Sequence, residues 1–206
     1  ISIIDAEQTG RVITMENCDN NTISDLTLTG GFTDSYGGGI RLDYSDPILI
    51  NVTISSNMAT WGGGIHSCYS NPMLTHVTIS NNQALQGGGI RLVDSNPILT
   101  HVTISNNQAS QGGGMRIIDS DLILTNVTIS NNFAGNTGGI YCSYSHPILR
   151  NVLISNNTSG GITCYSSNPI LTNVTITENS NNFFKNSFKI FNKFIWIFIF
   201  KTSPDT

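Results

Sequence analysis

Apolar and polar residues alternate in short runs along most of the chain, and glycine and proline separate these runs. The segment 52–55 (Val-Thr-Ile-Ser) has the two-residue period of a half-buried strand. The segment 40–42 (Ile-Arg-Leu) alternates in the same way, and the Gly triplets and Asn-Pro pairs between such segments predict turns. No 3.6-residue period appears between residues 11 and 180. We therefore expect strands and no helix in this part of the chain.

The runs belong to a repeat that reads approximately GGGIRLxxSNPILTNVTISNNxAxx. The apolar residue after each glycine pair or triplet recurs at intervals of 25, 25, 25, 25 and 22 residues. These residues are Ile40, Ile65, Ile90, Met115, Ile140 and Ile162. Repeats of this length, built from short strands, stack as a parallel β-solenoid with about 4.8 Å between coils. The sequence predicts an all-β solenoid over residues 1–182, with about six coils and a partial N-terminal coil.

Four apolar columns are expected to fill the interior, because each coil can bury its inner face only against neighbouring coils. The residues after the glycines form the first column. The other three contain Leu49, Leu74, Leu99, Leu124, Leu149 and Leu171; Val52, Val77, Val102, Val127, Val152 and Val174; and Ile54, Ile79, Ile104, Ile129, Ile154 and Ile176.

One polar column is invariant along the six repeats. It contains Asn57, Asn82, Asn107, Asn132, Asn157 and Asn179. We interpret it as a ladder of amide side chains that hydrogen-bond along the solenoid axis. A row of ligand-binding residues is the alternative, but a recognition site rarely needs one residue six times.

These motifs resemble a known family. The GGGI and TISNN blocks are similar to the right-handed parallel β-helix repeats of the pectin-lyase-like superfamily, and especially to those of bacterial surface proteins of the polymorphic outer-membrane type. The segments 10–17 (GRVITMEN) and 26–31 (LTLTGG) resemble the first coil of such proteins. The resemblance covers about residues 10–180 and implies a right-handed helix. For function it implies a range: lyases, glycoside hydrolases, adhesins and ice-binding relatives.

The position after proline departs from the superfamily, in which many members carry threonine there. Here the column contains Ile48, Met73, Ile98, Ile123, Ile148 and Ile170. If these side chains face outward, they form an apolar stripe of the kind that marks a partner surface, and a second copy of the chain is one candidate partner. If a bend turns them inward, they widen the core instead.

The composition and the length of the apolar runs exclude two classes of protein. Only 11% of the residues are charged, against about 25% in an average domain. No basic stripe is available to follow a phosphate backbone, so we expect no nucleic-acid partner. The apolar runs are also too short for a helical membrane bundle.

The segment 183–206 lies outside the repeat and has a different composition. It holds all four lysines and seven of the nine phenylalanines. Three interpretations stay open: translated sequence after a change of reading frame, a cap over the last coil, or an aromatic anchor at a membrane surface. No cap is recognisable before Ile1, so we expect the sequence to begin inside its first coil.

Two outward columns near the first strand of each repeat are the best candidates for a binding site. They contain Arg41, His66, Arg91, Arg116 and Tyr141, and, three residues further on, Tyr44, Tyr69, Asp94, Asp119 and Tyr144. Aromatic faces stack on sugar rings, and arginine binds carboxylates with two parallel hydrogen bonds. The alternative is a solvated face on which Arg91 and Arg116 neutralise Asp94 and Asp119.

The repeats are too regular to favour catalysis, because catalytic coils are expected to carry long loops. We expect a non-catalytic extracellular or cell-surface protein that binds a polysaccharide or surface glycan. A polysaccharide lyase or glycoside hydrolase is the alternative, and only the lyase would need Ca²⁺. We expect no other cofactor and no metal site, since His76 and His101 have no acidic partner. Cys142 and Cys164 lie in an inward column and are expected to be buried free thiols.

Overall fold

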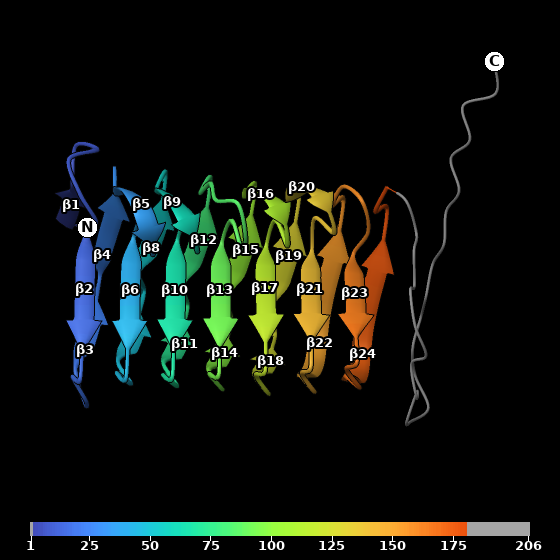
Figure 1. Cartoon of the computed structure of the whole chain (residues 1–206). Coiled ribbons are helices and arrows are strands. Elements are labelled where there is room, and N and C mark those ends of the chain that lie inside the picture. Colours follow the sequence, from blue (N-terminus) through green and yellow to red (C-terminus); the bar gives the residue numbers. More distant parts are fainter. Residues whose placement is uncertain (1, 181–206) are drawn as a thin grey trace, which may run out of the picture.

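The computed structural model describes residues 2–180 and shows a parallel β-solenoid of about seven turns (Figure 1). All strand pairs within this range are parallel, and each residue pairs with its equivalent one coil away, as Ile65 does with Ile90. No helix occurs among these residues, and so none of them forms a helix long and apolar enough to cross a membrane. The predicted all-β solenoid is confirmed. The segment 183–206, with its three interpretations, lies outside the described residues.

Three long ladders of strands run along the solenoid. The first ladder contains β2 (Ile13–Glu16), β6 (Ile40–Asp43), β10 (Ile65–Cys68), β13 (Ile90–Val93), β17 (Met115–Ile118), β21 (Ile140–Ser143) and β23 (Ile162–Tyr165). The second contains β3 (Thr22–Ser24), β7 (Ile48–Ile50), β11 (Met73–Thr75), β14 (Ile98–Thr100) and β18 (Ile123–Thr125). The third contains β1 (Ser2–Asp5), β4 (Leu26–Thr29), β8 (Thr53–Ser55), β12 (Thr78–Ser80), β15 (Thr103–Ser105) and β19 (Thr128–Ser130).

Two long strands, β22 (Ile148–Ser155) and β24 (Ile170–Thr177), join the second and third ladders into one sheet. Short strands complete the coils before the glycines. β5 (Phe32–Tyr36) pairs with β9 (Met58–Trp61), and β16 (Gln108–Gln111) pairs with β20 (Phe133–Asn136). Isolated bridges through Gln83 and Gln86 connect the two pairs. The result is a coil with a short fourth side.

The four predicted apolar columns all lie in the interior, and every member is buried. The inward column of the first ladder also holds Cys142 and Cys164, which are buried and free, as predicted. Interaction with the neighbouring Cys164 thiol, together with burial, raises the pKa of Cys142. Core packing therefore follows directly from the 25-residue period.

The Ile48 column faces outward and does not enter the core. Its members are half-buried or exposed, and Met73, Ile98 and Ile170 are the most exposed. Leu74 and Leu99, which follow two of them, are buried. The apolar side chains of this column therefore line the outer surface of the second ladder.

Each corner between ladders is made by a single residue in the left-handed region. Tyr44, Asn51 and Ser56 have φ values of 49°, 54° and 57° in one coil, and their equivalents repeat the pattern. Such residues turn the chain without a long loop. The glycine triplets permit the close approach of coils: a Cβ on Gly89 would lie 2.6 Å from the carbonyl oxygen of Gly114.

Two columns of polar side chains are buried where coils stack. The six asparagines form a hydrogen-bonded ladder, in which Asn82 Nδ2 donates to Asn107 Oδ1 at 3.0 Å. A second ladder of serines, which the sequence analysis did not single out, runs at the end of the first ladder of strands. The Ser70 backbone N–H donates to Ser95 Oγ at 3.1 Å, and equivalent bonds link the neighbouring coils. These ladders satisfy buried polar groups that no regular strand pairing reaches.

Candidate binding face on the first ladder

The first ladder carries a row of large polar side chains on its outer face. We call it the arginine row: Arg41, His66, Arg91, Arg116 and Tyr141, from β6, β10, β13, β17 and β21. Its members are register partners on successive coils. They face away from the core because the residues on either side of each, such as Ile40 and Leu42 around Arg41, are buried.

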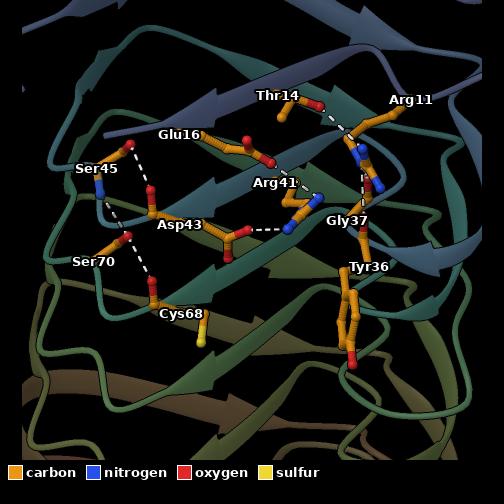
Figure 2. Close-up of polar contacts among 10 residues, drawn as sticks. All are labelled: Arg11, Thr14, Glu16, Tyr36, Gly37, Arg41, Asp43, Ser45, Cys68 and Ser70. Atoms are coloured by element: carbon orange, nitrogen blue, oxygen red, sulfur yellow. Dashed lines mark hydrogen bonds and ion pairs between the residues drawn. The ribbon is translucent and has the colours of Figure 1, made fainter. Parts of the chain in front are cut away.

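Arg41, at the N-terminal end of the row, is neutralised by two acids. Its guanidinium lies 3.2 Å from Glu16 Oε1 and forms a second ion pair with Asp43 (Figure 2). Arg11 lies nearby and donates to the carbonyl oxygens of Tyr36 and Gly37 at 2.8 and 2.7 Å. This end of the row therefore has internal partners for its charges.

Arg91 and Arg116, by contrast, form no ion pair with any described residue. Arg116 donates to the Ile117 carbonyl oxygen at 2.9 Å and to Ser143 Oγ at 3.0 Å, and its guanidinium lies 4.3 Å from the centroid of the Tyr141 ring. Burial lowers the pKa of both arginines. Asp94 and Asp119 therefore form no ion pairs with these arginines. The two adjacent guanidinium groups have no acidic partner among residues 2–180.

The prediction that every member of the arginine row is exposed is wrong for His66. Its side chain is buried, with 3% of the residue exposed. The ring of Tyr36 covers it at a centroid distance of 4.6 Å. Desolvation and, secondarily, the charges of Arg91 and Arg41 lower the pKa of His66 to about 3. The imidazole is therefore neutral near pH 7, and its Nδ1 is buried without a hydrogen-bond partner among residues 2–180.

Aromatic residues of the short strands flank the arginine row. The Tyr36 and Trp61 rings stack at a centroid distance of 4.7 Å. Both are half-buried and stand directly before a glycine triplet. Tyr36 and Trp61 were not predicted as site residues, since both predicted binding columns follow the triplets. The position before the triplet could have indicated them, since it recurs in every coil and holds Gln86 and Gln111 in the next two.

The second predicted column lies at the corner beyond the first ladder and is exposed. Tyr44 and Tyr69 stack at a centroid distance of 5.0 Å. Every member has positive φ, from 47° at Asp94 to 51° at Tyr144. Tyrosine is uncommon in this backbone region, which costs a bulky residue energy. The charge of Asp94 is the main cause of the raised pKa of Tyr69.

Asp43, His66 and Cys68 come together beside the arginine row, a cluster that the sequence analysis did not anticipate. A ligand-type side-chain atom of each lies within 4.8 Å of those of the other two. Figure 2 shows the Cys68 sulfur next to the Asp43 carboxylate, on neighbouring strands. Desolvation raises the pKa of Cys68, and the charges of Asp43 and Asp94 raise it further.

Comparison with known proteins identifies the family of the chain. A family model described as "Right handed beta helix region" matches residues 75–197, which is more than half of the chain. The chain therefore belongs to the right-handed β-helix family, and the resemblance described above is confirmed at the level of fold and handedness. Comparison with curated proteins and with solved structures finds no match.

Proposed function

We propose that the protein is a non-catalytic extracellular or cell-surface module that binds an acidic polysaccharide along the outer face of the first ladder. Arg91 and Arg116 would hold the acidic groups of the glycan, and the flanking aromatic side chains would pack against its sugar rings. The single observation that carries the proposal is the pair of adjacent guanidinium groups without an acidic partner among residues 2–180.

The electrostatics of this pair favour an anionic ligand. Arg91 and Arg116 are register partners on β13 and β17, so their like charges lie close together and are partly desolvated. An anion that accepts hydrogen bonds from both would relieve the repulsion and replace the lost hydration. Uronate carboxylates or sulfate esters, repeated along a polymer, fit a row that is itself periodic.

The surroundings of the pair favour a sugar polymer as the carrier of these anions. Tyr141 lies under the guanidinium of Arg116. Val93 and Ile118 occupy the next outward positions of β13 and β17 and are half-buried, so they offer an apolar surface beside the charges. Charged, aromatic and apolar groups in one extended strip match the alternating polar edges and apolar faces of a pyranose chain.

The carboxylates next to the row differ in their partners. Glu16 and Asp43 form ion pairs with Arg41, whereas Asp94 and Asp119 are exposed and form no ion pair with a described residue. Glycoside hydrolysis needs two carboxyl groups placed on either side of one bond. The lyase alternative needs carboxylates to hold Ca²⁺, together with a base, so an assay for reaction products separates binding from cleavage.

A glycan array that carries acidic and neutral polysaccharides tests the proposal. We expect retention of polyuronates or sulfated glycans and no retention of neutral ones, with and without added Ca²⁺. An assay for new reducing ends and for unsaturated products runs in parallel on the same polymers. Product release would establish the hydrolase or lyase instead, and binding to neutral glycans alone would overturn the assignment of the site to the arginine row.

A further inference from the structure

We propose that Asp43, His66 and Cys68 form a binding site for Zn²⁺ at the N-terminal end of the arginine row. The three side chains come from the neighbouring strands β6 and β10, and they provide one oxygen, one nitrogen and one sulfur ligand. This set is typical of zinc, which binds Cys, His and Asp in tetrahedral geometry. With three protein ligands, the fourth position would be left for water.

The geometry is close to that of a bound site. The three ligand atoms lie within 4.8 Å of one another. In a tetrahedral zinc site, ligand atoms about 2.0–2.3 Å from the metal are about 3.3–3.6 Å apart. Side-chain rotations that move the ligand atoms by about 1 Å would therefore close the cluster around the ion, with no change in the register of β6 and β10.

The buried imidazole of His66 independently supports a ligand at this position. Only 3% of the residue is exposed, and its buried Nδ1 makes no hydrogen bond with any residue that the structure describes. Buried polar atoms in folded proteins are nearly always paired, so an unpaired one requires an explanation. A metal ion that binds the imidazole directly, or that orders a water next to it, supplies one.

The charges around the cluster select the kind of ion. A thiolate and a carboxylate offset the two charges of Zn²⁺, so the filled site is neutral beside Arg41 and Arg91, and Cys68 releases its proton when the ion binds. Arg41 binds Asp43 and would hold the carboxylate in place, as outer hydrogen-bond partners do in metal sites. Ca²⁺ and Mg²⁺ prefer six or more oxygen ligands and do not suit one carboxylate with nitrogen and sulfur.

The cluster is specific to these two coils, and so the chain itself provides matched replacements. The position of His66 is arginine in the neighbouring repeats, and the position of Cys68 is Val93 and Ile118 in the next two. His66→Arg and Cys68→Val therefore introduce residues that the same ladder already accommodates. Cys18→Ser removes a thiol outside the cluster and is the control.

The test titrates the reduced, EDTA-treated full chain with Zn²⁺ alone, and with Co²⁺ as a spectroscopic probe. We expect one equivalent to bind, with a sulfur-to-cobalt charge-transfer band that Cys68→Val abolishes and Cys18→Ser retains. His66→Arg and Asp43→Asn should weaken Zn²⁺ binding by about 100-fold or more.

Far-ultraviolet circular dichroism establishes that each variant keeps its β-sheet spectrum. If Cys68→Val fails to fold, Cys68→Ser takes its place. Absence of the charge-transfer band from the parent chain would overturn the proposal. Survival of the band in the Cys68 variants would also overturn it, since the thiolate would then come from elsewhere. The titration contains no glycan, so its result is independent of the proposed polysaccharide binding.

Discussion

The side-chain oxygen of Asn107 accepts two hydrogen bonds from Asn82, one from its backbone N–H and one from its Nδ2, both at 3.0 Å. Asn107 in turn donates from Nδ2 to the Ile79 carbonyl oxygen at 3.0 Å. One amide therefore connects two coils and closes the turn of the coil below it. Because the column is buried, water cannot replace these partners.

Asn107→Ala should destabilise the solenoid by about 2–6 kcal/mol. The substitution leaves the Asn82 N–H and the Ile79 carbonyl oxygen without the partner that Asn107 supplied, and each such loss costs about 1–3 kcal/mol. Urea denaturation followed by circular dichroism measures the change. Gln108→Ala, which truncates the exposed amide next in sequence, should stay within about 0.5 kcal/mol of the parent chain. Equal effects of the two substitutions would show that the ladder contributes little to stability.

The third glycine of each triplet predicts a steric rather than a conformational sensitivity, since it lacks the positive φ of the first. Gly89→Ala places a Cβ 2.6 Å from the Gly114 carbonyl oxygen, so the coils must separate, at a cost of about 1–3 kcal/mol or more. Gly135→Ala places its Cβ 3.5 Å from the nearest atom, the Ser110 carbonyl oxygen. This control should be neutral, or stabilising by about 0.4–1 kcal/mol. Thermal melts that rank the two variants the other way would contradict the close packing of the triplets.

Adjacent residues of β14 should respond in opposite ways to one substitution. Ile98 is 39% exposed and Leu99 is 1% exposed. Ile98→Asn, alone or with Ile123→Asn, should change the melting temperature little. Leu99→Asn buries an amide without partners and removes core packing, so it should cost about 2–5 kcal/mol. A large loss with Ile98→Asn would place that side chain in the core instead.

The buried imidazole of His66 should make stability depend on pH. An unfolded histidine titrates near pH 6.5, whereas the pKa of His66 in the folded chain is about 3. Between these values the unfolded chain binds a proton that the folded chain does not. As pH is lowered from 6.5 to about 3, the free energy of unfolding should therefore decrease, by up to about 1.4 kcal/mol per pH unit.

His66→Gln removes this titration. Denaturation of the two chains in EDTA, at several values between pH 4 and 7, isolates the contribution of the imidazole as the difference between them. We expect the parent chain to lose stability relative to His66→Gln as pH falls. A difference that is constant over this range would show that His66 takes up its proton in the folded chain.

The interior could be predicted from the sequence because the period of 25 residues fixes the register. Once Ile65 lies above Ile40, the alternation along each strand decides which neighbours face inward. The buried asparagines were found for the same reason, since they recur without exception. The serine column recurs as regularly, but serine is common on surfaces, and its burial follows only from the corner geometry.

The outer face was predicted less well, because contacts between unlike side chains decide it. Tyr36 from the preceding coil covers His66, and Glu16 reaches Arg41 from β2. Neither contact repeats along the solenoid, so no column reveals it. The proximity of Asp43 to Cys68 likewise depends on which side chains two particular coils carry.

Arg150 provides the control for the central claim, which is that the unpaired guanidinium groups of Arg91 and Arg116 bind an acidic polysaccharide. Arg150 is exposed on β22, away from the first ladder. Arg150→Gln and the double variant Arg91→Gln/Arg116→Gln both replace guanidinium groups with amides. They differ in where charge is lost, and the control loses one charge whereas the double variant loses two.

Isothermal titration calorimetry with oligogalacturonates, at low and at moderate salt, measures the claim most directly. We expect the parent chain and Arg150→Gln to bind equally and the double variant to bind at least about 10-fold more weakly, because each charge-assisted hydrogen bond contributes about 1.5–3 kcal/mol. Salt should weaken binding by the parent chain more than binding by the double variant. Equal affinities of the parent chain and the double variant for the oligogalacturonate would contradict the account.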